Sequence, residues 1–184
     1  YECGDFIYSF DGPYDFNNNS FYVSQENNYE WSQANNITQE YGFYLATINS
    51  EDENTFIQNI FPDEGDCYMI GLYQDTTSLN YSEPDGGWEW VTGESLNVEF
   101  WEEDEPNNTA QIEHFAELCP SNGFWNDIRD DTERPFIMEC GGLFSIWGCT
   151  DEIACNYDGS ATDDDGSCYN NDLGCGCDTP AADT

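Results

Sequence analysis

The chain has 184 residues, of which 38% are hydrophobic and 16% aromatic, enough for one domain with a hydrophobic core and a smaller remainder. Its 39 acidic residues face two arginines and no lysine, which gives a formal net charge of −37. A surface this negative repels nucleic acid and anionic lipid and attracts divalent cations. No apolar run reaches the roughly 18 residues of a membrane-spanning helix. We therefore expect neither nucleic-acid binding nor membrane insertion.

Nine cysteines without the usual zinc spacings indicate disulfides, and hence an extracellular or cell-surface location. Zinc is disfavoured because Cys175 and Cys177 are too close together and His114 is the only histidine. The odd count leaves a thiol that is free, is paired between chains, or is paired with a cysteine outside this sequence. The chain opens at Tyr1 without a visible signal peptide, so we interpret it as a processed or excerpted segment.

Two amphipathic helices are predicted in the first third of the chain. Each segment starts with a capping-box pair, continues with apolar residues at helical spacing and ends at a helix-terminating residue. The pairs are Asn27 with Glu30 and Ser50 with Glu53, and the terminating residues are Gly42 and Pro62. Between the two helices, "FYLATI" (43–48) predicts a short apolar crossing.

The pattern then changes from helical to extended. Strands are predicted at "CYMIGLY" (67–73), "GWEWVTG" (87–93), "HFAELC" (114–119) and "RPFIMEC" (134–140). Residues 94–112 carry little periodicity and form a long polar loop, of the kind that is often functional. Two helices followed by short strands and a long loop predict an α+β domain over residues 1–147.

Residues 148–184 form a second segment, rich in Asp, Gly and Cys and poor in large aliphatic side chains. Such a segment cannot build its own core, so disulfides or bound calcium must hold it if it is ordered. Asp163, Asp165 and Gly166 provide half of a calcium-loop pattern, in which Ala161 occupies the first acidic position. A solvated acidic linker and a calcium loop both remain open, and the linker is favoured.

The stretch "EEDEPNN" (102–108) crowds acidic side chains that repel one another. Calcium takes six to eight oxygen ligands from carboxylates, amides and backbone. Glu105 and Asn107 offer two such oxygens, and a cis bond between Glu105 and Pro106 would turn both side chains toward one point. Further oxygen ligands follow along the chain: Glu113, and then Asn126 and Asp127 in "FWNDI" (124–128).

Taken in order, these motifs resemble the C-type lectin domain over roughly residues 6–140. The matching anchors are Trp31 with Ala34, "YLATI" with Glu53, "IGL" at 70–72, "WEWVTGE", "EPNN", Glu113, "WND" and "RPFIMEC". The resemblance implies a C-type lectin-like fold and a calcium ion that a sugar completes. Its ligands, and the sugar's, would be Glu105, Asn107, Glu113, Asn126 and Asp127. The EPN form resembles the type that prefers mannose-, glucose- or fucose-like sugars, which are neutral hexoses.

The sequence departs from the family at its cysteines. Phe115, Asp130, Met138 and the region of Thr38 stand where the family has cysteine, so both family disulfides are lost as pairs. Cys67 with Cys119 and Cys3 with Cys140 are the proposed replacements. Asn108 and His114 stand where the family's second calcium site has acids, and His114 is interpreted as a strand residue. The second segment resembles "GCTD…ACNY…DDGSC" repeats of extracellular proteins of aquatic microbes.

Sequons for N-glycosylation occur at Asn18, Asn36 and Asn80, which lie in polar stretches and are candidate glycosylation sites. Asn107 also begins a sequon. We expect it to stay unmodified, because its amide is assigned to calcium and sugar.

Two functions follow from different classes. The first is a calcium-dependent carbohydrate-binding module of an extracellular protein. The alternative is a self-associating subunit of an extracellular filament or matrix, which would use the same fold as a calcium-stabilised scaffold. An enzyme is not expected, because no Ser/His/Asp set and no phosphate loop occur and carboxylate pairs reflect only the abundance of acids.

Overall fold

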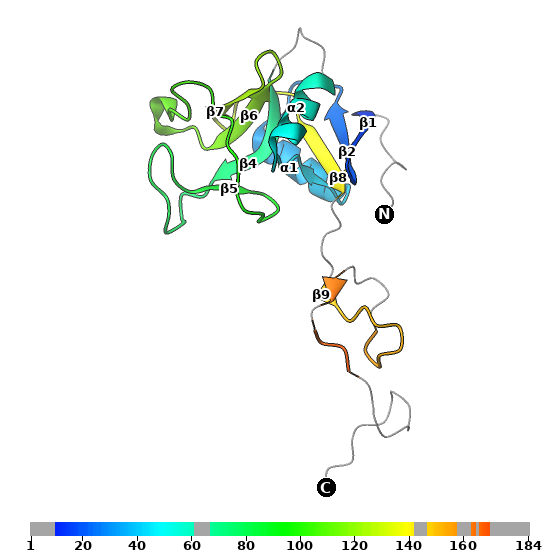
Figure 1. Ribbon diagram of the computed structural model, residues 1–184. Coiled ribbons are helices and arrows are strands. Elements are labelled where there is room, and N and C mark those ends of the chain that lie inside the picture. The colour runs from blue at the N-terminus through cyan, green and yellow to red at the C-terminus, as the bar shows by residue number, and fades with distance from the viewer. Residues whose placement is uncertain (1–9, 61–66, 142–146, 158–162, 165, 170–184) are drawn as a thin grey trace. The chain divides into compact units, whose positions relative to one another are not determined.

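A computed structural model describes residues 10–60, 67–141, 147–157, 163–164 and 166–169 (Figure 1). The chain divides into two compact units, Tyr1–Cys140 and Gly141–Thr184. The boundary expected at residues 147 and 148 stays a prediction. Within the described residues, no helix has the length and apolar character needed to cross a bilayer.

The described residues of the larger unit form two α-helices and two four-stranded sheets (Figure 1). One sheet has the order β1-β2-β8-β3 and the other β5-β4-β6-β7, with antiparallel pairing between neighbours such as β4 and β6. In chain order the elements are β1 (Phe10–Phe16), β2 (Asn19–Ser24), α1 (Trp31–Glu40), β3 (Tyr44–Leu45), α2 (Glu51–Ile60), β4 (Tyr68–Gln74), β5 (Trp88–Trp90), the 3-10 turn η1 (Thr109–Gln111), β6 (Phe115–Cys119), β7 (Phe124–Ile128) and β8 (Ile137–Gly141). The predicted α+β class is confirmed.

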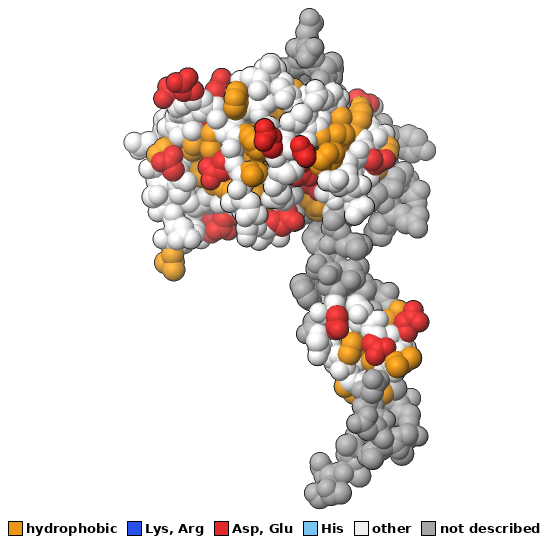
Figure 2. Space-filling view, viewed as in Figure 1, with side chains coloured by type: hydrophobic (Ala, Val, Ile, Leu, Met, Phe, Trp, Pro, Cys, Tyr) orange, Lys and Arg blue, Asp and Glu red, His pale blue; other side chains and the backbone are white. Residues whose placement is uncertain are grey.

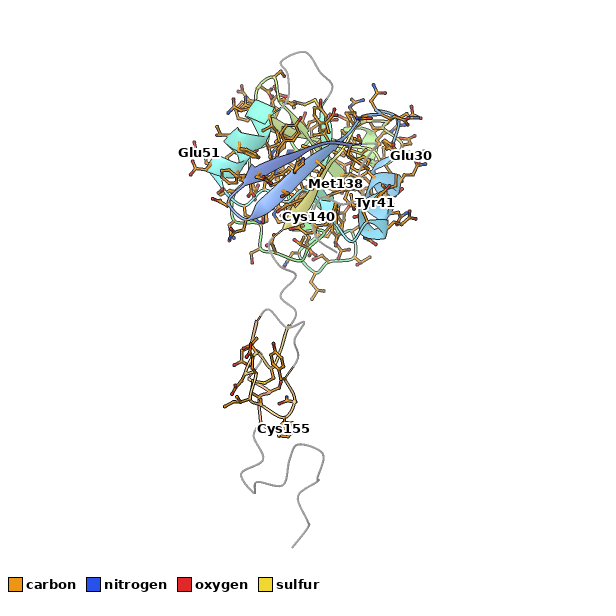
Figure 3. The ribbon with its side chains drawn as sticks, turned by 90° about the vertical axis from the view of Figure 1, so that its right-hand side faces the viewer. Glu30, Tyr41, Glu51, Met138, Cys140 and Cys155 are labelled. Atoms are coloured by element: carbon orange, nitrogen blue, oxygen red, sulfur yellow. A yellow bond between two sulfur atoms is a disulfide. The ribbon has the colours of Figure 1, made fainter. Side chains whose placement is uncertain are left out.

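Helix α1 forms where predicted, but its capping box is displaced by one turn. Glu30 itself is the N-cap, and its backbone N–H donates to Gln33 Oε1 at 3.3 Å. The predicted pair of Asn27 with Glu30 was therefore wrong, because Glu30 lies before the first helical turn rather than inside it. Gly42, with φ of +74°, follows the helix as predicted. Figure 3 labels Glu30 and Tyr41 at the two ends of α1.

Helix α2 keeps half of its predicted capping box. Ser50 Oγ accepts a hydrogen bond from the Glu53 N–H at 3.1 Å. Glu53 Oε2 accepts from the N–H of Asn49 at 2.8 Å instead of from that of Ser50. The helix ends at Ile60, and Pro62, its predicted terminator, lies outside the described residues.

The hairpin of β1 and β2 was not predicted. Its pairing runs from Phe10 opposite Ser24 to Phe16 opposite Asn19, with an irregularity after Asp11. Glycine, proline and asparagine residues in this stretch disguise a strand pattern, because they are typical of turns. Burial decides the structure, since Phe21 in β2 is fully buried in the core.

The two sheets meet at "IGL" in β4. A Cβ atom on Gly71 would lie 2.5 Å from the carbonyl oxygen of Leu45 in β3, so only glycine permits this approach. Trp31 of α1 donates its indole N–H to the carbonyl of Ile70 at 2.8 Å. Both sheets and both helices contribute side chains to the hydrophobic interior, which consists of two clusters of buried residues.

Disulfides hold both units. Cys67 and Cys119 are bonded, which confirms that predicted pair across 52 residues. Cys140 is also disulfide-bonded, but its predicted partner Cys3 lies outside the described residues. In the smaller unit one disulfide joins Cys149 to Cys168, and Cys155 is also disulfide-bonded.

The smaller unit also contains β9 (Trp147–Gly148), which pairs in parallel with β10 (Asp163–Asp164). Of the two acids of the predicted calcium loop, Asp163 contributes its backbone to β10. Asp165 lies outside the described residues, so a calcium ion in this loop stays a prediction.

A buried glutamate ties the first sheet together. Glu139 of β8 is 1% exposed. Its Oε1 accepts from Asn19 Nδ2 at 2.6 Å and from the Tyr44 hydroxyl at 3.2 Å. Its Oε2 accepts from the N–H and the hydroxyl of Thr47 at 2.9 and 3.2 Å. Burial raises the pKa of Glu139 to about 8, against the opposing effect of the Thr47 hydrogen bonds.

We expect Glu139 to make folding less favourable as pH rises. The folded carboxyl keeps its proton up to about pH 8, whereas the unfolded one loses it near pH 4.3 (about the unperturbed value), so stability falls between these values. Glu139→Gln should flatten this slope in urea unfolding at pH 5, 6.5 and 8 with chelator present. Glu89→Gln, at an exposed position of β5, is the control. Equal slopes in wild type and Glu139→Gln would contradict the assignment.

Candidate metal and ligand site

The long loop between β5 and β6 is fastened to the core through Trp125 of β7. The Trp125 ring is fully buried, and its indole N–H donates to Asn54 Oδ1 at 3.0 Å. The Trp125 N–H donates to the carbonyl of Phe100 at 2.7 Å, and its carbonyl accepts from Glu102 at 2.9 Å. The loop therefore runs along β7 just before it enters the acidic stretch 102–108.

Asp127, two residues after Trp125 in β7, binds the backbone of the long loop. Trp125 and Asp127 lie on the same face of the strand, because side chains alternate. Asp127 Oδ1 accepts from the backbone N–H of Asn107 at 3.0 Å, and Oδ2 accepts from that of Asn108 at 2.7 Å. The Asp127 residue is 1% exposed, so these two bonds form in a largely water-free environment.

Glu105 lies beside this aspartate with one oxygen that lacks a donor. The Glu105–Pro106 peptide bond is cis, as predicted. Glu105 Oε1 accepts from Asn107 Nδ2 at 2.6 Å, whereas Oε2 is buried without a hydrogen-bond partner. Burial, and then the neighbouring Asp127 carboxyl, raise the pKa of Glu105 to about 7. A carboxyl group this close disfavours the charged form of Glu105.

Glu113 closes the loop on itself. Its Oε2 accepts from the N–H of Thr109 at 2.8 Å, and its own N–H donates to Asn108 Oδ1 at 3.0 Å. Asn108 adopts a left-handed conformation with φ of 45°, which lets the chain turn sharply here. Burial raises the pKa of Glu113, and the charge of Asp127 adds to this effect. Glu105, Asn107 and Glu113 are thus gathered around Asp127.

Asn126, the fifth predicted ligand, has a different hydrogen-bond partner. Its Nδ2 donates to Glu117 Oε1 at 3.0 Å, on the neighbouring strand β6. Glu117 is 3% exposed, and its Oε2 accepts from Arg134 Nε at 2.8 Å. The described contacts of Asn126 therefore run to this buried ion pair, and not to the other four predicted ligands.

The arrangement of the loop acids fits a hard divalent cation. Burial and the neighbouring Asp127 carboxyl raise the pKa of Glu105, and Glu105 Oε2 is buried without a donor. A cation would satisfy this oxygen and remove the repulsion. Carboxylate and amide oxygens are the ligands that calcium prefers. Cys67, Glu117 and Cys119 also bring potential ligand atoms within 4.8 Å, but the two sulfurs form a disulfide and cannot bind metal.

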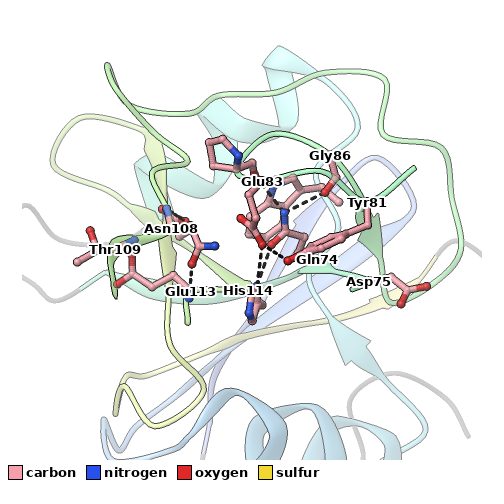
Figure 4. A network of polar contacts seen from close by, with 12 residues as sticks. Gln74, Asp75, Tyr81, Glu83, Gly86, Asn108, Thr109, Glu113 and His114 are labelled. Carbon is pink, nitrogen blue, oxygen red and sulfur yellow. Dashed lines mark hydrogen bonds and ion pairs between the residues drawn. The ribbon is translucent and has the colours of Figure 1, made fainter. Parts of the chain in front are cut away.

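His114 belongs to a network of polar contacts next to this site (Figure 4). Its Nδ1 lies 2.8 Å from Gln74 Oε1, across 40 positions of sequence. The two residues that stand where the family's second calcium site has acids, Asn108 and His114, are both engaged in hydrogen bonds. Gln74 is a member of this network that the sequence analysis did not predict. Nothing in the sequence pattern indicated that a glutamine at the end of β4 would be buried.

Comparison with known proteins decides the family. The sequence matches the family described as "Lectin C-type domain" over residues 27–140. The chain belongs to the C-type lectin domain family. Human "C-type lectin domain family 6 member A" is 30% identical over 134 residues, which cover 70% of this chain and 59% of that protein. The match thus spans about three fifths of the relative's length.

Solved C-type lectin structures share the fold. The carbohydrate-recognition domain of cow CD23, determined in the presence of a GlcNAc2Man3 oligosaccharide, has a TM-score of 0.60 and 21% identity, covering 76% of this chain and 98% of that chain. A calcium-independent type II antifreeze protein also has a TM-score of 0.60, with 17% identity, covering 74% of this chain and 95% of that chain.

Family membership has two consequences. The C-type lectin family is non-enzymatic, in agreement with the expectation that the chain is not an enzyme. C-type lectin domains generally bind calcium, but one protein with this fold is described as calcium-independent. Calcium binding by this chain therefore has to be argued from its own residues.

The chain's two arginines form a matched pair for a test of the buried ion pair. Arg134→Met leaves Glu117 buried without its cation, which should lower the free energy of unfolding by about 3 kcal/mol. Arg129 pairs with Asp131 at the surface, so Arg129→Met should cost at most about 1 kcal/mol. Urea unfolding of both variants measures the difference. Equal decreases in the free energy of unfolding would show that the buried Glu117–Arg134 ion pair stabilises the fold no more than the surface pair does.

Proposed function

We propose that this chain is a calcium-dependent carbohydrate-binding module of an extracellular protein, for neutral sugars of the mannose and glucose type. The observation that carries the proposal is the buried, donor-less Oε2 of Glu105 beside Asp127. The ion would be held by side-chain oxygens of Glu105, Asn107, Glu113 and Asp127. The side-chain amide oxygen of Asn126 would be a fifth ligand. The cow CD23 domain determined in the presence of an oligosaccharide supports a carbohydrate ligand by analogy.

When bound, calcium supplies a Lewis-acidic centre that accepts sugar hydroxyls as ligands. The protein side chains select which hydroxyls fit, because a carboxylate accepts a hydrogen bond and an amide N–H₂ group donates one. Glu105 would accept from one sugar hydroxyl while Asn107 donates to its neighbour. Such a contact is small and wet, so we expect a dissociation constant on the order of millimolar. Several modules acting together would supply avidity.

The charges of the chain favour neutral ligands over acidic ones. Both arginines are already paired, Arg129 with Asp131 and Arg134 with Glu117. Figure 2 shows Asp and Glu side chains distributed over the visible face of the larger unit. A sialylated, uronic or sulfated glycan would meet this negative field without a lysine or a free arginine to bind it.

An extracellular or cell-surface location agrees with the disulfides Cys67–Cys119 and Cys149–Cys168. The predicted glycosylation sites Asn18, Asn36 and Asn80 are all exposed. Their modification, and the absence of a glycan on Asn107, stay predictions.

Glu105→Gln should act in opposite directions without and with calcium. In chelator, the variant removes one of two adjacent carboxylates, so its melting temperature should equal or exceed that of the wild type. At a hundredfold excess of calcium over its dissociation constant, the wild type should gain about 2.7 kcal/mol, and the variant much less. Differential scanning calorimetry with chelator and with calcium measures both effects.

The matched control is Glu103→Gln, which makes the same charge change at an exposed position of the same stretch. It should keep the wild-type gain from calcium. A wild-type melting temperature that calcium leaves unchanged would remove the proposed metal site.

Exchanging the Glu105 and Asn107 functions should change the preferred sugar. In Glu105→Gln with Asn107→Asp, donor and acceptor trade places while the net charge is kept. Their mutual hydrogen bond of 2.6 Å can reverse its direction, so the loop should keep its shape. Binding should then shift from mannose-like toward galactose-like sugars.

Calorimetric titration of both proteins with both sugars, at saturating calcium, measures this shift. If none of the four titrations gives a binding heat, binding of these sugars is excluded. The alternative function, a calcium-stabilised scaffold in an extracellular assembly, would then remain. Binding of mannose by both proteins with equal affinity would instead show that these two residues do not select the hydroxyls.

A further inference from the structure

One of the chain's two arginines lies next to the candidate calcium site. Arg129 follows directly on β7, two residues after Asp127. The His114 N–H donates to the Ile128 carbonyl at 3.1 Å, in the antiparallel register of β6 and β7. Arg129 therefore lies opposite the start of β6, beside Glu113. A positive charge is thus within reach of one of the proposed calcium ligands.

Arg129 and Glu113 are close enough to influence each other. The hydrogen bonds from Arg129 to Asp131 raise the pKa of the guanidinium most, the Asp131 charge adds to this effect, and the charge of Glu113 makes a smaller contribution. An arginine that paired with Glu113 would supply the positive charge that the acidic site otherwise receives from calcium. Such a pair would compete with the ion, because each would have to displace the other.

In the structure, the Arg129 guanidinium binds Asp131 instead. Its Nε donates to Asp131 Oδ1 at 2.7 Å, and its Nη2 donates to Oδ2 at 2.5 Å. Two parallel hydrogen bonds match the planar fork of the guanidinium and fix its direction. Both side chains are exposed, and exposed ion pairs contribute little to the stability of a fold. The effect of this pair is therefore on where Arg129 points.

The acid between these two residues, Asp130, is already engaged elsewhere. Its Oδ1 accepts from the N–H of Ser32 at 2.8 Å, and its Oδ2 accepts from the Ser32 hydroxyl at 3.1 Å, in the first turn of α1. An Arg129 side chain released from Asp131 would therefore turn to Glu113. The carboxyl of Glu113 belongs to the acidic group that is gathered around Asp127, so the released arginine would enter the proposed metal site.

We propose that Asp131 is a positioning residue, which holds Arg129 away from Glu113 and so leaves the acidic site to calcium. The proposal rests on the proposed function, because it concerns the affinity of the site for its metal. It gives a role to a surface ion pair that lies outside the five expected ligands. Loss of Asp131 would turn Arg129 into an internal competitor of the ion.

Calorimetric titration of Asp131→Asn with calcium tests this role. If the released Arg129 pairs with Glu113 in about nine molecules of ten, the apparent calcium affinity falls about tenfold. Glu133→Gln is the matched control, because it removes the same charge from an exposed residue of the same segment. It should lower the affinity no more than about twofold, through the general field of the acidic surface.

A second substitution separates this positioning role from a simple effect of charge. In the wild type, Arg129→Met should raise the calcium affinity about twofold, because it removes a positive charge near the site. In the Asp131→Asn background, the same substitution also removes the competitor and should raise the affinity about twentyfold. Equal increases in the two backgrounds would show that the two residues act only through their charges, and would overturn the proposal.

The arginine Nε NMR signals give a readout that needs no metal. The chain has only two arginines, so Arg129→Met identifies the signal of Arg129. In chelator, Glu113→Gln should leave this signal nearly unchanged in the wild-type background and shift it in the Asp131→Asn background.

The outcomes distinguish the two proposals. Calcium binding with equal affinity by the wild type, Asp131→Asn and Glu133→Gln would overturn the role of Asp131 and leave the proposed function intact. An Arg129 signal that does not respond to Glu113→Gln in either background would do the same. A wild type that binds no calcium would overturn both proposals.

Discussion

The candidate metal and ligand site depends on the two hydrogen bonds between the Asp127 carboxylate and the backbone N–H groups of Asn107 and Asn108. They fasten a long polar loop to strand β7. On the same face of this strand, two residues before Asp127, lies Trp125, which is fully buried. Because both Asp127 oxygens already hold backbone, the loop has a defined shape before any ion binds. The acidic side chains of the loop are therefore held close together by the backbone conformation, despite their mutual repulsion.

Three acidic side chains of this strongly acidic chain differ in how their buried oxygens are compensated. Glu117 is compensated by a cation, Arg134, and Glu139 by hydrogen-bond donors from three residues. Glu105 lies beside Asp127 and keeps one buried oxygen that has neither a cation nor a hydrogen-bond donor. The contrast distinguishes the loop from the acidic surface in general, because a cation bound there would compensate an oxygen that has no other partner. Net charge alone could not have made this distinction.

The sequence predicted elements whose signals are local, and it failed where distant residues decide the structure. The helices, β4, β5 and the apolar alternation around Trp88 followed from periodicity. The hairpin of β1 and β2 did not, because its turn-forming residues hide a strand that burial of Phe21 enforces. The role of Asn126 as a metal ligand, inferred from its position in "WND", stays a prediction, and its Nδ2 donates to Glu117 on β6. That partner, and the contact of Gln74 with His114, arise only from strand pairing.

Two positions at which the resemblance implies a family cysteine, Phe115 and Asp130, make noncovalent contacts instead. Phe115 packs on Trp31 with ring centroids 4.5 Å apart, and Asp130 accepts from the Ser32 N–H at the start of α1 at 2.8 Å. The disulfide between Cys67 and Cys119 joins the end of β6 to the residue before β4. Asp127 pairs with Ala116, near the opposite end of β6, so the disulfide lies at the end of the sheet away from Asp127. At the ligand end, β4 and β6 are held by hydrogen bonds between Gln74 and His114. Covalent rigidity therefore lies away from the ligand loops, whose positions depend on polar contacts that a bound ion and sugar would reinforce.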